Sequence, residues 1–309
     1  MSRTPKSASK AATRTARAQR SHPTPRLNPM MACDTAFRVI ARRYIGDLTA
    51  NHGATCKGDP DALHQMRIAL TRLRTIIWFF SPMVTDSQRT KIRDELKWLN
   101  AHLGAARDLD VAIERLQATN KKQPQDEPYY RAWNDKRANN HRVLARALQS
   151  TRYRRLMEDT SGWIENGPWS VKRGKQAAKE RAVPVAEYSA EKLARRLEKL
   201  LKKSRNLLKM DAEKRHRLRL SNKKLSYSIE AFEDLFSDKR FARLQAGLKP
   251  LRKAQRSLGQ LNDDERGRAL AATLKRDGAH APWHFLGSKR EKRLLQTAAT
   301  AYRKLTADR

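Results

Sequence analysis

The feature that most constrains the fold is a helical spacing of apolar residues in a chain with few residues that would interrupt it. Within residues 63–80 the apolar side chains follow alternating steps of three and four residues and so share one helical stripe: Leu63, Met66, Leu70, Leu73, Ile77 and Phe80. Glycine and proline number only 12 each among 309 residues, and no segment alternates apolar and polar residues as a strand would. The sequence therefore predicts an all-α protein made of helical bundles.

Short breaks divide the chain into ten predicted helices, which span about residues 31–52, 60–80, 86–103, 108–120, 128–158, 176–208, 211–236, 238–258, 262–276 and 288–306. Gly167, Pro168 and Gly174 mark a linker at about residues 165–175. We therefore predict a helical domain over residues 30–309, with one half at about 30–165 and the other at about 176–309.

The N-terminal segment differs in composition from the rest of the chain. Residues 1–26 contain seven Lys or Arg and no acid, and Pro5, Pro23 and Pro25 disfavour a stable helix. We predict a disordered basic arm over residues 1–29. An organellar transit peptide has a similar composition and is the alternative interpretation.

The whole chain is strongly basic, with 67 Lys and Arg against 32 Asp and Glu and a net charge of +35. The arm supplies +7 of this charge, which leaves +28 on residues 27–309. Such an excess destabilises a compact chain through self-repulsion, which a polyanionic partner would relieve. Nucleic acid, polyphosphate and an anionic membrane surface all fit, and a basic protein without a dedicated partner is the alternative.

The two cysteines, Cys33 and Cys56, form neither a disulfide framework nor a zinc-site spacing, which fits a reducing cytosol. No apolar run approaches the roughly 20 residues of a membrane span, and the N-terminus lacks the apolar core of a signal peptide. We therefore expect a cytoplasmic protein without a membrane partner. The sequence defines no oligomeric state.

Two segments of the chain match each other. Residues 63–80 align with residues 215–232 at an offset of 152, which pairs His64 with His216 and Arg67 with Arg219. A second pair follows in the same order, with LGAARD at 103–108 and LGQLND at 258–263, offset by 155. Two motifs at nearly equal spacing indicate an internal duplication, with chance similarity between basic helices as the alternative.

Each copy of the motif predicts a helix that is apolar on one side and cationic on another. Beside the apolar stripe, the first copy carries His64, Arg67, Thr71 and Arg74, and the second carries His216, Arg219, Lys223 and Ser226. A basic stripe is usually a solvated face. Because this one occurs twice and has little acid nearby, we interpret it as a binding surface.

These residues resemble the CHAD family, the conserved-histidine α-helical domain. The match rests on a His-x-hydrophobic-Arg helix and a later Leu-Gly-x-x-Arg/Asn-Asp element, each present twice, and covers about residues 30–309. The resemblance implies two helical bundles related by a pseudo-twofold axis. It also implies binding of inorganic polyphosphate on a basic central surface, and association with polyphosphate granules.

Carried over by position, the resemblance gives a set of polyphosphate ligands: His64, Arg67, Arg72, Arg74, His216, Arg219, Lys223 and Lys224. Lys97 and Arg252 join them because each lies seven residues before a motif glycine, Gly104 or Gly259. Ser226 stands where the first copy has Arg74, so the two halves need not contribute equally.

The chemistry of polyphosphate suits such a surface. The polymer carries no bases, so binding it requires phosphate-binding Arg and Lys on rigid supports. Single-strand nucleic-acid binders instead interleave stacking aromatics with basic residues. Here Trp78, Phe79 and Phe80 lie in or beside the apolar stripe. Weak nonspecific nucleic-acid binding is therefore the first alternative, to which the basic arm could contribute.

A metal-dependent phosphohydrolase is the second alternative, because Asp263, Asp264 and Glu265 form an acidic cluster that could hold Mg²⁺. We instead expect Asp263, like Asp108, to cap a helix after the Leu-Gly break or to hold a binding arginine in place.

Other catalytic signals are weak. His280 and His284 have helical metal-ligand spacing, but Pro282 lies between them. The sequence contains no nucleophile–base set and no glycine-rich phosphate loop. We therefore expect a non-catalytic protein that uses no metal or cofactor.

Overall fold

The computed structural model describes residues 26–119, 128–171, 174–276 and 285–307, and within these ranges it is helical without a strand. The α-helices are α1 (Cys33–Cys56), α2 (Pro60–Phe79), α3 (Ser87–Thr119), α4 (Pro128–Gln149), α5 (Thr151–Asn166), α6 (Lys175–Ala182), α7 (Val185–Ser204), α8 (Ala212–Glu230), α9 (Ala242–Arg276) and α10 (Ser288–Ala307). Short 3₁₀ helices lie at η2 (Pro168–Ser170), η3 (Leu207–Lys209), η4 (Glu233–Leu235) and η5 (Lys239–Phe241). The predicted all-α fold is confirmed.

Two predicted helices are each divided in the structure. The predicted helix at 128–158 ends at Gln149, and α5 begins after Ser150, whose hydroxyl oxygen accepts a hydrogen bond from Tyr153 N at 3.2 Å. Serine is a preferred N-cap residue because it satisfies a free N–H of the first turn. The predicted helix at 176–208 is interrupted at Pro184, between α6 and α7.

The predicted breaks at the two Leu-Gly elements are wrong. Both α3 and α9 continue through these elements, so Asp108 and Asp263 lie inside helices and do not cap them. A glycine inside a helix costs about 1 kcal/mol relative to alanine. Burial of Leu103 on α3 and of Leu258 on α9 offsets that cost, because each fixes its helix against the core.

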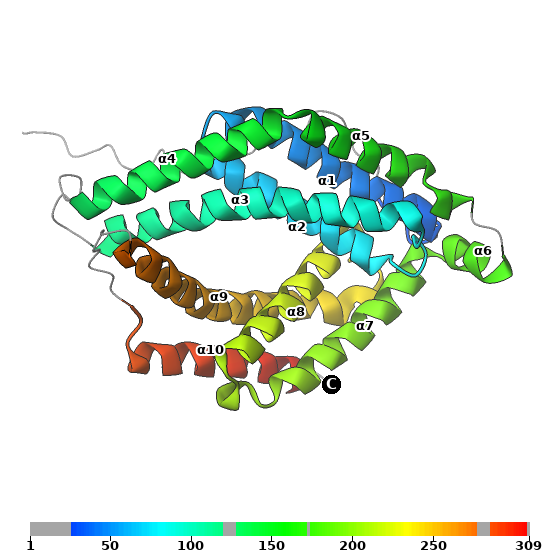
Figure 1. Cartoon of the computed structure of the whole chain (residues 1–309). Helices are drawn as coiled ribbons and strands as arrows, with labels where there is room; N and C mark the ends of the chain where they lie inside the picture. The colour runs from blue at the N-terminus through cyan, green and yellow to red at the C-terminus, as the bar shows by residue number, and fades with distance from the viewer. Residues whose placement is uncertain (1–25, 120–127, 172–173, 277–284, 308–309) are drawn as a thin grey trace, which may run out of the picture.

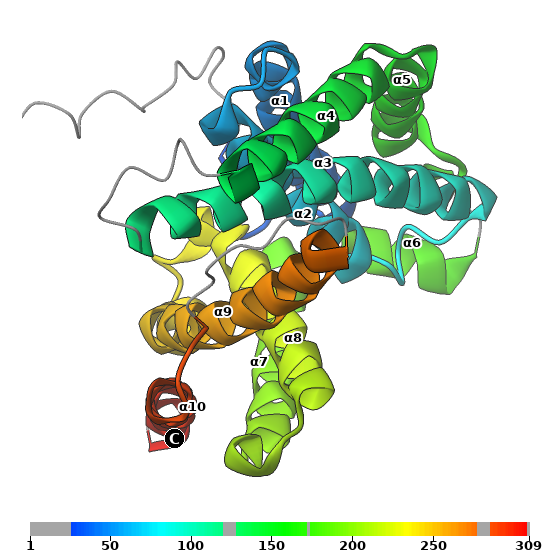
Figure 2. The same ribbon diagram turned by 60° about the vertical axis from the view of Figure 1, so that its left-hand side comes forward.

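The helices form two groups. Figure 1 shows α1–α5 on one side of the molecule and α7–α10 on the other. In Figures 1 and 2 α2 and α8 lie where the two groups meet, and these helices contact each other. The two motif helices therefore face each other across the middle of the molecule.

Each motif helix begins in the same way. Asp59 caps α2 by accepting hydrogen bonds from two backbone N–H groups, those of Asp61 at 2.8 Å and Ala62 at 3.0 Å. Asp211 caps α8 by accepting from Lys214 N at 2.7 Å. Each cap lies five residues before the motif histidine. The local sequence therefore sets the same helical register in α2 and α8.

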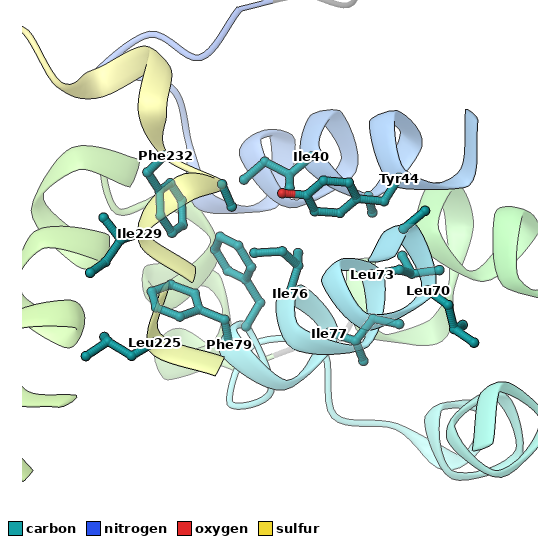
Figure 3. Packing of buried hydrophobic residues seen from close by; sticks show 14 of the residues in the cluster. Ile40, Tyr44, Leu70, Leu73, Ile76, Ile77, Phe79, Leu225, Ile229 and Phe232 are labelled. Atoms are coloured by element: carbon teal, nitrogen blue, oxygen red, sulfur yellow. The ribbon is translucent and has the colours of Figure 1, made fainter. Parts of the chain in front are cut away.

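One hydrophobic core joins the two groups of helices. Phe79 of α2 packs against Phe232, which follows α8, with ring centroids 5.1 Å apart. Phe80 stacks on Tyr188 of α7 at 5.7 Å. Figure 3 shows Phe79 beside Leu225 and Phe232. These aromatic contacts fix α2, α7 and α8 relative to one another, and so position the polar faces of the motif helices.

The described part of the predicted linker contributes a side chain to this core. Trp169, within η2, is fully buried, lies edge-on to Phe37 at 5.3 Å, and donates its indole N–H to Trp163 O at 2.8 Å. Gly167 is required here because a Cβ at this position would lie 2.5 Å from the same carbonyl oxygen. Residues 167–169, within the predicted linker, are therefore part of the folded structure.

The described chain begins at Arg26, inside the segment that we predict to be a disordered arm. Leu27 is buried, and its N–H donates to Asp234 Oδ2 at 3.2 Å. The folded part therefore begins before residue 30. The rest of the predicted arm, residues 1–25, lies outside the described residues, as do His280, Pro282 and His284.

None of the helices in the described ranges is long and apolar enough to cross a membrane.

Candidate anion-binding surface

Cations from both groups of helices meet where α2 and α8 cross. We call Arg67 of α2, Arg219 and Lys223 of α8, and Arg266 of α9 the central cluster. Burial and the positive charges of the three arginines lower the pKa of Lys223 to about 8, against a smaller opposing effect of Asp263. The lysine amine is thus held close to three guanidinium groups, an arrangement that favours a bound anion.

Asp108 bridges two members of the central cluster. Its Oδ1 accepts from Arg67 Nη1 at 3.3 Å and from Arg266 Nη1 at 3.0 Å. Arg67 Nη1 also donates to Gly104 O at 3.3 Å. Asp108 and Gly104 of the first Leu-Gly element therefore orient Arg67. This agrees with the expectation that Asp108 holds a binding arginine in place.

The positive charge of Arg219 is less completely neutralised than that of Arg67, which pairs with Asp108. Burial lowers its pKa, and the attraction of Asp263 opposes this effect while Arg266 and Arg67 add to it. Its Nε is buried, and none of the residues that the structure describes forms a hydrogen bond with it. A buried donor without a partner costs free energy, which a bound anion would recover.

The two motif histidines have different surroundings. His64 lies at the surface of α2, where partial burial and the charges of Arg107 and Arg67 lower its pKa. His216 Nδ1 lies 2.6 Å from Asn262 Oδ1, so its Nδ1–H donates to the amide oxygen and links α8 to α9. His64 is therefore available to a ligand through either nitrogen, whereas one nitrogen of His216 is already used.

An acid engages two of the predicted ligands. Glu230 accepts from Arg72 Nη2 at 3.4 Å and from Arg252 Nη2 at 2.9 Å, and its side chain is only 16% exposed. This ion-pair network joins α2, α8 and α9. Arg72 and Arg252 are thus bound to a carboxylate in this structure, and an anion would have to compete with Glu230 for them.

The remaining predicted ligands lie apart from the central cluster. Arg74 and Lys224 lie near each other on the side of the α2–α8 crossing that faces α7, where burial and then the charge of Arg74 lower the pKa of Lys224. Lys97 is exposed on α3. Within the described chain no hydrogen bond or ion pair joins it to the central cluster or to Arg74 and Lys224.

The sequence does not single out two arginines that the fold brings to this surface. Arg266 of α9 joins the central cluster. It lies one turn after Asp263 of the second Leu-Gly element, and this position could have identified it from the sequence. Arg196 of α7 lies over the Trp78 ring at 3.7 Å. Its helix carries many basic residues, and nothing in the sequence distinguishes Arg196 from its neighbours.

The acidic cluster at 263–265 is engaged in structural contacts. Asp264 accepts from Leu286 N at 2.9 Å and from Arg268 Nε at 3.0 Å, and Glu265 pairs with Arg215 at 3.5 Å. Among the residues that the structure describes, no three His, Cys, Asp or Glu side chains are grouped so that they could hold a metal ion.

The fold and this surface define a class of protein: an all-helical domain whose two groups of helices meet at a basic surface. The chain belongs to the CHAD domain family, whose model matches residues 39–272. The suggested resemblance to this family is confirmed.

Solved structures resemble the chain over most of its length. It is similar to the CHAD domain from the plant Ricinus communis, with 25% identity, a TM-score of 0.69, and coverage of 93% of this chain and 91% of that one. PptA from Streptomyces chartreusis has the same fold, with 15% identity, a TM-score of 0.56, and coverage of 90% and 96%. No curated protein sequence matches the chain.

Proposed function

We propose that this protein binds inorganic polyphosphate on the central cluster and is a non-catalytic component of polyphosphate granules. The observation that carries the proposal is the convergence of Arg67, Arg219, Lys223 and Arg266 from helices of both groups. Asp108 and Asp263 only partly offset their charge. A flexible chain of phosphates can place one group after another on such cations without any base to be recognised.

The aromatic residues favour polyphosphate over single-stranded nucleic acid. Phe79 and Phe80 are fully buried. Trp78 is 37% exposed, but the Arg196 guanidinium already lies over its ring. The side chains near the central cluster therefore offer few free ring faces on which bases could stack.

The engaged acids support a binding role over a hydrolytic one. A metal-dependent phosphohydrolase uses metal ions to neutralise developing charge, and carboxylates usually hold them. Here Asp264 and Glu265 are paired with arginines. These contacts make the phosphohydrolase alternative the weaker interpretation.

We expect the full chain to bind long-chain polyphosphate more tightly than single-stranded DNA at equal charge concentration and physiological salt. Competition between labelled polyphosphate and unlabelled DNA measures this preference, and the same samples with Mg²⁺ should release no phosphate. Affinity should fall steeply with salt, because binding releases counterions. Equal or tighter DNA binding would favour the nucleic-acid alternative, and phosphate release would favour the hydrolase.

Polyphosphate affinity should depend on pH through Lys223. Its pKa of about 8 in the free protein lies below the ordinary value of 10.5, and bound phosphate stabilises the charged amine. Affinity should therefore change little near pH 7 and fall by up to about tenfold per pH unit above pH 8, as binding comes to require proton uptake. Titrations at constant ionic strength measure this slope.

The matched variants are Lys223→Arg and Lys192→Arg. Arginine stays charged over this range, so Lys223→Arg should keep its affinity up to pH 9. Lys192 also has a pKa lowered to about 8, but its amine packs over the Tyr188 ring at 4.5 Å, so Lys192→Arg should retain the slope. A slope that Lys223→Arg leaves unchanged would remove Lys223 from the site.

A further inference from the structure

A second group of cations lies on the α7 side of the α2–α8 crossing. Arg74 of α2, Lys224 of α8 and Arg196 of α7 form this α7-side cluster around Trp78. The Arg196 Cζ lies 3.7 Å from the Trp78 ring centroid, and the Lys224 Nζ lies 4.9 Å from it. One aromatic ring thus holds two cations from two other helices in place.

The α7-side cluster is not neutralised by any acidic side chain that the structure describes. In the described part of the chain, no carboxylate forms an ion pair with Arg74, Lys224 or Arg196. Arg196 Nη1 is buried and has no hydrogen-bond partner in the described ranges. Burial lowers the pKa of Arg196 to about 10, so the guanidinium stays charged at neutral pH. Three charged groups with an unused buried donor are a costly arrangement that an anion would stabilise.

The other side of the crossing is chemically different. At the offset of 152 that aligns the motif helices, Trp78 corresponds to Glu230 and Arg196 to Tyr44. Glu230 holds Arg72 and Arg252 in ion pairs, whereas the opposite position carries an indole and no acid. One side of the crossing is therefore neutralised from within the protein, and the other lacks a counterion among the described residues.

We propose that Arg74, Lys224 and Arg196 form a second phosphate-binding site, and that a polyphosphate chain bound at the central cluster extends into it on the α7 side only. The inference rests on the proposed function. Arg67 and Arg74 lie two turns apart on α2, so one chain can reach both clusters. Trp78 is a positioning residue, because it fixes the cations without contacting phosphate itself.

The test compares two double variants of the full chain. Arg74→Ala with Arg196→Ala removes two cations of the α7-side cluster. Arg195→Ala with Lys199→Ala removes the same charge from exposed positions of α7. The first pair should weaken binding of long-chain polyphosphate about tenfold or more and change tripolyphosphate binding less than about threefold. The control pair should change both affinities less than about threefold.

Trp78 provides an independent readout. Phosphate at Arg196 alters the contact between guanidinium and indole, so long-chain polyphosphate should change the tryptophan emission of the wild-type chain. The same addition to the Trp78→Phe variant should leave the emission unchanged, because phenylalanine still supports the cations but does not report on them.

The outcomes separate the two proposals. If the wild-type chain binds no polyphosphate, the proposed function fails. If the wild type binds and the Arg74→Ala, Arg196→Ala pair behaves like its control, only the second site is overturned. An equal loss for long and short polymers in that variant would contradict the extension of one chain across both clusters.

Discussion

Replacing Arg67 and Arg219 together by glutamate should weaken polyphosphate binding by roughly a hundredfold or more at physiological salt. Each charge-assisted contact to phosphate contributes about 1.5–3 kcal/mol, and about 1.4 kcal/mol corresponds to tenfold in affinity. The change also places two negative charges beside Lys223, where they repel the polymer. Isothermal titration with a polymer of defined length measures the loss.

The helices should survive this change. Arg67 and Arg219 lie beside the apolar stripes of α2 and α8 and contribute nothing to the aromatic core, so circular dichroism should be nearly unchanged. The matched control is Arg154→Glu with Arg155→Glu, the same change of charge at exposed positions of α5. Comparable losses in both variants would show that binding follows net charge and has no defined site.

The single changes test whether both groups of helices contribute. Arg67→Glu and Arg219→Glu should each weaken binding strongly, because the two arginines come from opposite groups and affect the same amine of Lys223. If one of them has no effect while the other abolishes binding, the shared site is wrong and the polymer binds one group of helices alone.

The largest effect on stability should come from Phe232→Ala. Phe232 is fully buried and contacts Phe79 and Phe80, with ring centroids 5.1 and 6.2 Å apart. Removing such a ring costs about 3–5 kcal/mol in the free energy of unfolding, because the surrounding groups close the cavity only in part. Urea denaturation measures the change, and the midpoint of thermal unfolding should fall by on the order of 10 °C.

Leu208→Ala is the control, since this leucine is 59% exposed and its truncation should change stability by no more than about 0.5 kcal/mol. Because one core joins both groups of helices, the wild-type chain should unfold in a single transition. Two separate transitions, with only one of them shifted by Phe232→Ala, would show that the groups are stable independently.

The acids decide which of the predicted cations are available to a polymer. Glu230 occupies Arg72 and Arg252, and Asp108 occupies Arg67 and Arg266. The side chain of Asp108 is 44% exposed, and that of Glu230 only 16%. The Asp108 contacts are therefore the easier for phosphate to displace, because solvent already screens them. This difference favours Arg67 over Arg72 as a polyphosphate ligand.

Much of the helical structure follows from local sequence. The three- and four-residue steps of apolar residues predict α2 correctly to within one residue at its end. The helix expected over 211–236 begins as predicted, to within one residue, but α8 ends at Glu230. Helix periodicity is a local property, since a helix buries one stripe whatever it packs against. The Leu-Gly elements show the limit of that reasoning. Gly104 and Gly259 disfavour a helix locally, but burial of the neighbouring leucines keeps α3 and α9 continuous.

The sequence by itself determined the helical class, the basic character and the two motif helices with their cationic faces. Only the tertiary structure decided which cations share a site. The Arg72–Glu230 and Asp108–Arg266 pairs each join residues 158 positions apart, and Arg196 reaches Trp78 from another helix. A carboxylate neutralises a cation when the packing of the helices brings the two groups within a few ångströms of each other. The spacing of residues along the chain does not specify that distance.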